Sequence, residues 1–259
     1  GDPGAVPEVI GRRLRFVACL LFALPAAAQD PAGCPVVPQP AISAPRFASA
    51  VARGEVRIVA FGSSSTAGAG ASLPSRAYPA RLEAVLREGL PGIPVTVMNR
   101  GVGGEDAANM IGRLERDVIA ERPDLVIWQT GANAALRSMS PERFRAYLLE
   151  GLARLRREGI DVVLMDNQRA PRIDARPGHR AYDAILAEAA AAVPGVGLFS
   201  RGALMDALAV RGVPQAALLA PDGLHHNDRG YVCVAEALAR ALPPPTHGVW
   251  QAAGGGQGR

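Results

Sequence analysis

Short apolar runs alternate with longer amphipathic stretches along most of the chain. The near-continuous apolar character of buried strands occurs over residues 56–61, 94–99, 125–129, 161–165 and 196–199. Apolar residues recur at helical spacing over residues 78–88, 106–120, 141–157, 179–192 and 228–241. Buried strands separated by helices predict a parallel sheet that helices cover on both faces. We therefore expect an α/β fold, a three-layer α/β/α sandwich with a five-stranded parallel sheet.

The beginning of the chain shows a different pattern. A basic segment at 12–15 precedes a short apolar run at 16–24 and a group of small residues that ends at Ala28. This order is typical of a secretory signal peptide, and we expect cleavage after Ala28. The apolar run has about half the ~20 residues needed to span a bilayer, so a permanent anchor is the weaker interpretation. The protein is thus expected to be secreted or periplasmic, with the export route left open.

These patterns divide the chain into four parts. Residues 1–28 contain the signal peptide and the residues upstream of it. Residues 29–53 are rich in Pro and Ala and predict an extended arm. The alternating region 54–242 is expected to be one domain, and the Pro- and Gly-containing tail 243–259 is expected to be disordered.

Composition and charge exclude some classes of protein. The chain is 49% hydrophobic and 20% charged, which supplies enough apolar material for a sizeable core and argues against wholesale disorder. Its formal net charge is +4, and all 28 basic residues are Arg. These arginines are scattered among 24 acids and form no clustered basic patch in the sequence. Binding of nucleic acid would need such a patch, so it is not expected.

Two cysteines remain after the predicted cleavage, Cys34 and Cys233. In an oxidising compartment they can form one disulfide that ties the N-terminal arm to the last helix. Two unrelated thiols, one in a loop and one buried in a helix, are the alternative, and the sequence leaves both open.

Four loops at the ends of predicted elements carry unusual polar residues. In parallel α/β sheets ligands bind outside the carboxyl ends of the strands, so chemistry is expected in such loops. After the first strand, Gly62 precedes three serines at a strand-to-helix turn, where a hydroxyl and backbone N–H groups can point to one place. A turn that only caps a helix is the alternative. The turn differs from the Gly-x-Ser-x-Gly pattern of α/β-hydrolases, because Thr66 replaces the second Gly.

The next two loops offer hydrogen-bond donors for a negatively charged oxygen. Residues 99–105 read Asn-Arg-Gly-Val-Gly-Gly-Glu, and the glycines allow a backbone N–H to approach a ligand closely. After the third strand comes Asn133, whose side-chain amide can donate to a developing oxyanion. Each loop taken alone is explained equally well as an ordinary turn.

The loop before the last helix contains two adjacent histidines, His225 and His226. Asp222 precedes the first by three residues, so its carboxylate can accept the Nδ1–H and fix the tautomer. A metal site needs more ligands than this loop provides, since the other histidines are His179 and His247 and the chain has no Cys-x-x-Cys. The sequence therefore favours acid–base chemistry over a metal site at this loop.

Taken together and in this order, the four loops resemble the SGNH hydrolases, also called the GDSL-type esterase family. The likeness covers nearly the whole predicted domain and implies a flavodoxin-like sheet. It implies that Ser64 is the nucleophile and that Asp222 and His225 complete the catalytic triad. It also implies an oxyanion hole formed by the N–H groups of Ser64 and Gly104 and by the amide of Asn133.

Two positions depart from the family pattern. The usual Gly-Asp-Ser is Gly-Ser-Ser at 62–64, and the usual Gly-x-Asn-Asp ends in Ala134. Neither missing Asp is the triad acid, so the resemblance still implies ester hydrolysis through an acyl-enzyme, with no cofactor. The family spacing favours Gly104 over Gly101 and Gly103 as the oxyanion glycine.

The expected activity is that of an exported serine esterase that removes short acyl groups from a small-molecule or glycan ester. An O-acyltransferase with the same triad and a non-catalytic carbohydrate-binding domain are the alternatives. We expect no nucleic-acid partner and no stable membrane anchor after signal cleavage. In the loop that follows the fourth strand, Asn167 and Arg169 could contact substrate, although a solvated loop is the simpler interpretation.

Overall fold

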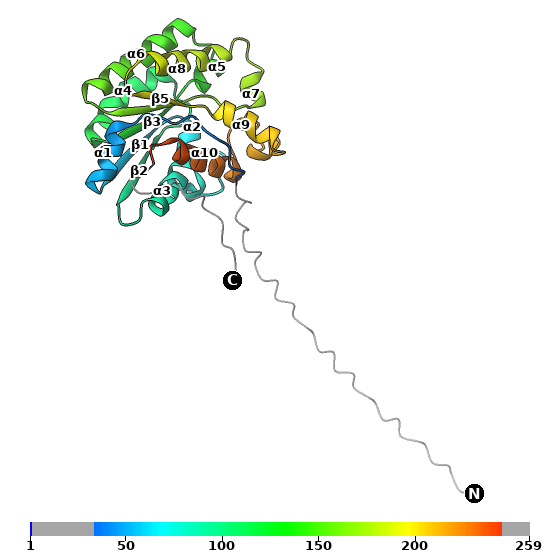
Figure 1. The fold of residues 1–259 in the computed structure, drawn as a ribbon. Helices are drawn as coiled ribbons and strands as arrows, with labels where there is room; N and C mark the ends of the chain where they lie inside the picture. Colours follow the sequence, from blue (N-terminus) through cyan, green and yellow to red (C-terminus); the bar gives the residue numbers. More distant parts are fainter. Residues whose placement is uncertain (2–33, 245–259) are drawn as a thin grey trace. The chain divides into compact units, whose positions relative to one another are not determined.

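The computed structural model describes Gly1 and residues 34–244. Within these residues one parallel sheet has the strand order β2-β1-β3-β4-β5 (Figure 1). Its strands are β1 (Val56–Gly62), β2 (Val95–Gly101), β3 (Leu125–Gln129), β4 (Asp161–Met165) and β5 (Val196–Phe199). The expected sandwich around a five-stranded parallel sheet is confirmed, and this strand order is the flavodoxin-like one.

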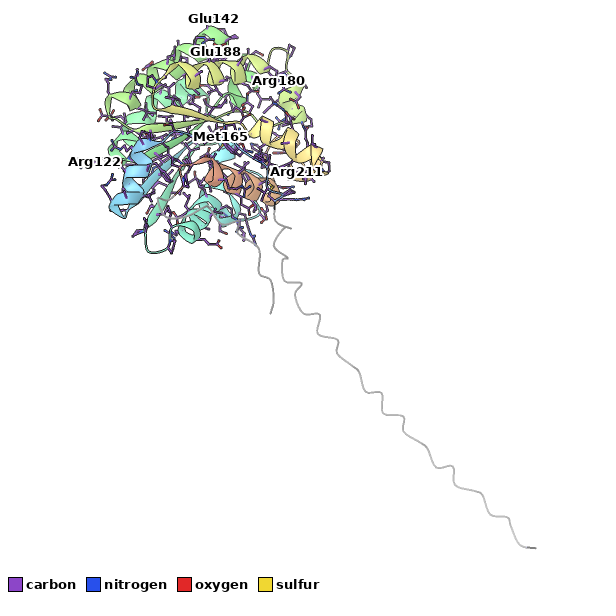
Figure 2. All side chains as sticks on the ribbon, viewed as in Figure 1. Arg122, Glu142, Met165, Arg180, Glu188 and Arg211 are labelled. Atoms are coloured by element: carbon purple, nitrogen blue, oxygen red, sulfur yellow. A yellow bond between two sulfur atoms is a disulfide. The ribbon has the colours of Figure 1, made fainter. Side chains whose placement is uncertain are left out.

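Helices pack on both faces of the sheet because alternate strand residues point in opposite directions (Figure 1). Ile58 and Ala60 face one core, whereas Val59 and Phe61 face the other. The first core is covered by α1 (Pro45–Arg53), α3 (Tyr78–Gly89), α9 (Arg201–Val210) and α10 (Asp228–Ala241). The second is covered by α4 (Ala107–Asp117), α6 (Pro141–Arg157) and α8 (Arg180–Ala192). Figure 2 shows Met165 in the interior and labelled charged residues such as Glu142 on the periphery.

Short helical segments connect these elements. They are α2 (Ser64–Ala67), α5 (Ala132–Leu136), α7 (Pro171–Asp174), η1 (Pro74–Arg76), η2 (Ile119–Glu121) and η3 (Gln215–Leu218). The limits of α6 and α10 agree with the sequence prediction, and those of α3 and α8 differ by one residue. Sequence reasoning missed α9, a largely apolar helix that Ser200 caps by accepting from the Ala203 N–H.

The expected extended arm at 29–53 is wrong in its second half. Residues 34–44 have no helix or strand, but Pro45–Arg53 forms α1. Proline is well tolerated in the first turn of a helix, and Gly54 ends the helix in the left-handed conformation. Phe47, Ala50 and Val51 recur at helical spacing and are buried against the sheet. This segment therefore packs into the same core as the predicted domain.

The structure joins Cys34 to Cys233 through a disulfide. Cys233 is buried in α10, and a backbone hydrogen bond of 2.8 Å from Ile42 N to Ala241 O holds the same segment against the end of that helix. The two contacts fix residues 34–42 along α10.

The predicted signal peptide and nearly all of the predicted tail lie outside the described residues. Within residues 34–244, no helix combines the length and apolar character needed to cross a membrane.

Candidate active site

The structure brings Ser64, Asp222 and His225 together at the carboxyl end of the sheet. His225 Nε2 lies 2.8 Å from Ser64 Oγ, and His225 Nδ1 lies 2.5 Å from Asp222 Oδ2. Ser64 is the first residue of α2, directly after β1, and the other two residues come from the loop before α10. The three side chains therefore form a hydrogen-bonded chain from carboxylate to imidazole to hydroxyl.

Electrostatics keep Asp222 ionised. Burial raises its pKa, but hydrogen bonds from the His225 ring and from the backbone N–H groups of His225 and Leu224 outweigh that effect. The net pKa of Asp222 therefore lies below its usual value. An ionised Asp222 can hold the proton on His225 Nδ1, which leaves Nε2 to accept a proton from Ser64.

The neighbouring His226 has a different environment. Its side chain is buried, its Nδ1 lies 3.1 Å from the carbonyl of Leu218, and its ring packs edge-on against Tyr231. Burial, together with the charge of Arg201, lowers the pKa of His226 to about 3. His226 is therefore a neutral residue of the interior, and His225 is the histidine that contacts Ser64.

Contacts with the segment after α2 fix the position of the histidine loop (residues 221–227) relative to Ser64. Ser72 donates from its backbone N and its hydroxyl to Asp228, at 2.8 and 2.5 Å. Tyr231 Oη donates to the carbonyl of Ala69 at 2.6 Å. At Gly70 a Cβ would lie 2.3 Å from the carbonyl oxygen of His226, so this close approach requires glycine.

Gln129, at the end of β3, fixes the turn that presents Ser64. Its Oε1 accepts hydrogen bonds from Ser63 N, Ser63 Oγ and Thr66 Oγ1 at 3.0, 3.2 and 3.1 Å. A Cβ on Gly62 would lie 2.3 Å from Thr66 Oγ1 and 2.8 Å from Gln129 Oε1. The glycine therefore lets the turn close over the Gln129 amide.

The loop at 101–104 lies beside Ser64. The N–H of Gly101 is occupied by Asn99 Oδ1 at 2.9 Å, and that of Val102 is occupied by the carbonyl of Gly62 at 3.0 Å. In the described part of the chain, the N–H groups of Gly103 and Gly104 donate to no protein acceptor. A Cβ placed on Gly103 would lie 4.0 Å from Ser64 Cβ, which locates the loop against the serine.

The Asn133 side chain points to the same loop from the start of α5. Its Nδ2 donates one hydrogen to the carbonyl of Glu105 at 2.7 Å. An amide nitrogen carries two hydrogens, so the second is available to a ligand oxygen. The contact with Glu105 also fixes which end of the amide is the donor.

Asn167 and Arg169 do not lie in a solvated loop, which corrects the simpler of the two expectations. Asn167 is 1% exposed, and Arg169 forms an ion pair with Asp206 at 2.9 Å. The adjacent Gln168 donates from Nε2 to the carbonyl of Leu224 at 2.7 Å, next to His225. This loop is largely buried, and Gln168 joins it to the loop that contains His225.

Asp166, the first residue of this loop, carries a pH prediction. Burial raises its pKa to about 6, although hydrogen bonds from Ser200 Oγ and the backbone N–H groups of Arg201 and Gly202 favour the carboxylate. The folded state then binds the proton more tightly than the unfolded state, whose pKa is ~3.9. The stabilisation from this group is present below pH ~4 and is lost as the pH rises to about 6.

We therefore expect the free energy of unfolding of the wild type, relative to Asp166→Asn, to fall by about 2 kcal/mol from pH 4 to pH 7. Urea denaturation of both proteins at several pH values measures this difference. A difference that stays constant with pH would contradict the raised pKa.

Within residues 34–244 no three His, Cys, Asp or Glu side chains gather closely enough to hold a metal ion. The chemistry that this arrangement can perform is nucleophilic attack by a serine hydroxyl, with acid–base assistance from a histidine.

The model of the Non-GDSL lipase-like family matches residues 34–244. The chain belongs to this family. The family description agrees with the Gly-Ser-Ser sequence that stands where Gly-Asp-Ser is usual. The expected relationship to the SGNH hydrolases is confirmed, and α1, which precedes the predicted domain, falls within the match.

Two relatives of this Non-GDSL lipase-like protein are esterases. An arylesterase of Vibrio mimicus is 25% identical over 194 residues, which cover 75% of this chain and 92% of the relative. Esterase TesA of Pseudomonas aeruginosa is 30% identical over 100 residues, which cover 38% of this chain and 50% of the relative. The protein is thus a hydrolase that acts on ester bonds. The alternative of a non-catalytic carbohydrate-binding domain is set aside.

Solved structures of esterases share the fold. A two-domain esterase active on acetylated mannans superimposes with a TM-score of 0.60 at 22% identity, over 74% of this chain and 50% of that one. This chain therefore spans half of that protein. The acetyl xylan esterase AlAXEase superimposes with a TM-score of 0.60 at 21% identity, over 71% of this chain and 98% of that one.

Sequence reasoning missed the residues that support the site. Gln129 is the one polar residue in the strand Leu-Val-Ile-Trp-Gln, and a polar side chain at the end of a buried strand was a usable signal. Asn99 joins α2 to the neighbouring loop by donating from Nδ2 to the carbonyl of Thr66 at 2.8 Å. Arg113 occupies a buried position of α4, which nothing in its charge could indicate.

Proposed function

We propose that the protein is an exported serine esterase that hydrolyses short-acyl esters with Ser64 as nucleophile. The observation that carries the proposal is the chain of contacts from Asp222 through His225 to Ser64, at 2.5 and 2.8 Å. The order of these groups matches the requirement for an activated serine, namely a base at hydrogen-bond distance and a third group that orients the base.

In the proposed reaction, Ser64 Oγ attacks the ester carbonyl carbon while His225 Nε2 takes the hydroxyl proton. The tetrahedral intermediate then expels the alcohol, whose oxygen receives that proton from His225, and an acyl-Ser64 ester remains. A water molecule attacks this ester with His225 again as base. The carboxylic acid leaves and Ser64 recovers its proton.

The oxyanion of each tetrahedral intermediate would lie among the N–H groups of Ser64 and Gly104 and the free amide hydrogen of Asn133. Support comes from the hydrogen bonds of the loop, because Gly101 and Val102 have already used their N–H groups. Fixed donors of this kind stabilise charge that develops only in the transition state.

The proposed substrate is a small acyl ester, with acetyl groups on a glycan as the leading example. The structural likeness to esterases active on acetylated mannans and acetylated xylan supports this class. Export is proposed from the basic, apolar and small residues at 12–28 and agrees with the disulfide between Cys34 and Cys233. Acyl transfer to a sugar hydroxyl through the same acyl-enzyme is the alternative outcome.

Hydrolysis of p-nitrophenyl esters from acetate to palmitate tests the proposal. We expect the highest kcat/KM on acetate, a steady fall with acyl length, and release of acetate from acetylated mannan or xylan. Palmitate as the best substrate would overturn the short-acyl assignment. An acceptor sugar in the same assay separates the two outcomes, because a transferase would form acyl-sugar in place of free acid.

A further inference from the structure

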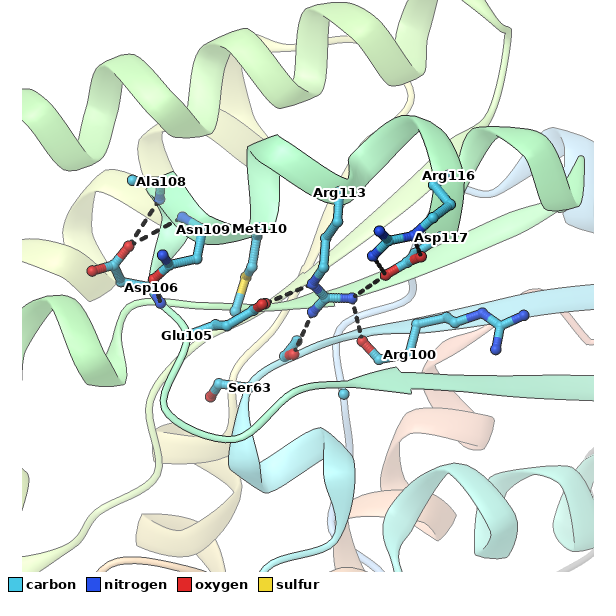
Figure 3. A network of polar contacts seen from close by, with 12 residues as sticks. Ser63, Arg100, Glu105, Asp106, Ala108, Asn109, Met110, Arg113, Arg116 and Asp117 are labelled. Atoms are coloured by element: carbon cyan, nitrogen blue, oxygen red, sulfur yellow. Dashed lines mark hydrogen bonds and ion pairs between the residues drawn. The ribbon is translucent and has the colours of Figure 1, made fainter.

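The buried guanidinium of Arg113 hydrogen-bonds to several segments beside the proposed active site (Figure 3). The Arg113 side chain is 6% exposed, and its Cζ atom lies 4.4 Å from the ring centroid of Phe61. Arg113 comes from α4, yet most of the atoms it contacts belong to the ends of β1 and β2 and to the loop after β2.

Arg113 holds both ends of the loop at 101–104. Its Nη1 donates to the carbonyl of Arg100 at 2.9 Å, directly before the loop, and its Nε donates to Glu105 Oε2 at 2.6 Å, directly after it. The backbone carbonyl of Glu105 in turn accepts the hydrogen bond from Asn133. One side chain thus fixes the loop that carries Gly104 and the residue that orients Asn133.

The same guanidinium reaches the turn that presents the nucleophile. Nη2 of Arg113 donates to the carbonyl of Gly62 at 3.0 Å, two residues before Ser64. That carbonyl also accepts the N–H of Val102 at 3.0 Å. Arg113 therefore links the nucleophile turn and the oxyanion loop through an oxygen that both segments share.

The charges around Arg113 explain why it can be buried. Glu105 Oε2 lies 2.6 Å from its Nε, and Asp117 Oδ2 lies 3.1 Å from its Nη1, so two carboxylates accompany the cation. Asp117 lies one turn further along α4, away from the loop (Figure 3). The two acidic partners thus differ in position, and only Glu105 is attached to the proposed oxyanion loop.

We propose that Arg113 is a positioning residue for catalysis, which sets the distance between the oxyanion donors and Ser64. This inference rests on the proposed function, because it assigns a role relative to the Gly104 and Asn133 donors. The guanidinium suits the role since its planar fork bonds in fixed directions to the acceptors on β1, β2 and the loop, and to Asp117 as a fourth acceptor. An ammonium group at position 113 would keep the charge but could not keep these directions.

The variant Arg113→Lys tests the proposal. A displacement of about 1 Å in a catalytic constellation costs roughly 100-fold in rate. We expect kcat on p-nitrophenyl acetate to fall about 10- to 100-fold with KM nearly unchanged. Rates are to be expressed per active site, titrated with a fluorophosphonate, so that loss of folded protein does not enter the comparison.

A second readout separates positioning from stability. Ser64 Oγ adds to the carbonyl carbon of an alkyl trifluoromethyl ketone and forms a tetrahedral oxyanion. The affinity of this inhibitor therefore reports on the oxyanion hole. We expect its Ki to rise in Arg113→Lys by about the factor lost in kcat/KM. Asp117→Asn is the matched control, because it alters a partner of the same guanidinium on the far side from the loop. That control should lower the melting temperature with kcat and Ki nearly unchanged.

Glu105→Ala provides the test if Arg113→Lys does not fold, since it frees one end of the loop and leaves Arg113 in place. It should lower kcat in the same direction by a smaller factor. An Arg113→Lys enzyme with normal kcat per site and normal Ki would overturn the positioning role, as would a loss equally large in Asp117→Asn. If the wild type hydrolyses no ester, the proposed function fails instead, so the two failures are distinguishable.

Discussion

Replacing Ser64 with Ala is expected to abolish ester hydrolysis while the fold remains intact. Without Oγ no acyl-enzyme can form, and His225 Nε2 loses the hydroxyl that lies 2.8 Å away. Removing the serine of such a triad lowers kcat on the order of 10⁶-fold. Steady-state hydrolysis of p-nitrophenyl acetate by both proteins measures the loss, and circular dichroism establishes that the variant is folded.

The neighbouring hydroxyl of Ser65 supplies a matched control. Ser65 is buried directly after Ser64 in α2, so Ser65→Ala makes the same chemical change one residue away. It should retain kcat within a few-fold of the wild type. A fluorophosphonate should label the wild type at Ser64 and leave Ser64→Ala unlabelled. Full activity in Ser64→Ala would remove this serine from the mechanism.

The second large effect is expected for Asn133→Ala, which should lower kcat about 100- to 1000-fold with little change in KM. The amide donates to the substrate oxygen most strongly when that oxygen becomes an anion, so its loss raises the barrier by about 2.7–4 kcal/mol and hardly weakens binding. Michaelis–Menten analysis on p-nitrophenyl acetate separates the two constants.

Asn109→Ala is the control for this variant. Asn109 also uses its amide within the protein, where Oδ1 accepts from Asp106 N at 3.2 Å in the capping box of α4. Its removal should reduce stability and leave kcat close to the wild-type value. If Asn133→Ala instead raised KM with a normal kcat, Asn133 would be a binding residue and the oxyanion would need another donor.

The arrangement of the sheet could be predicted because its strands are buried on both faces. Runs such as Leu125–Gln129 and Asp161–Met165 are apolar at nearly every position, and this pattern marks their limits. Segments whose burial depends on distant partners could not be found in this way. The helix α1 belongs to that group, since Phe47 becomes a core residue only when the chain returns to the sheet.

Ser64, Gly104 and Asn133 could be located because loops that follow parallel strands meet at one edge of the sheet. Ser64 and His225 are 161 residues apart in the chain, and the family resemblance alone suggested that they pair. The residues that hold the catalytic groups in place could not be predicted by the same reasoning. Arg113 and Gln129 act through atoms of the backbone and of other side chains, and only the folded structure identifies those partners.

The turn around Gln129 also makes positions 63 and 129 dependent on each other. Gln129 Oε1 is an acceptor that faces both the N–H and the hydroxyl of Ser63. An Asp at position 63, the family's usual residue, would place a carboxylate against that oxygen. Reversing the amide would pair the carboxylate with Nε2 but leave the backbone N–H of residue 63 facing a donor. The Gly-Ser-Ser form of this turn therefore suits Gln at position 129, because one acceptor oxygen serves both donors of residue 63.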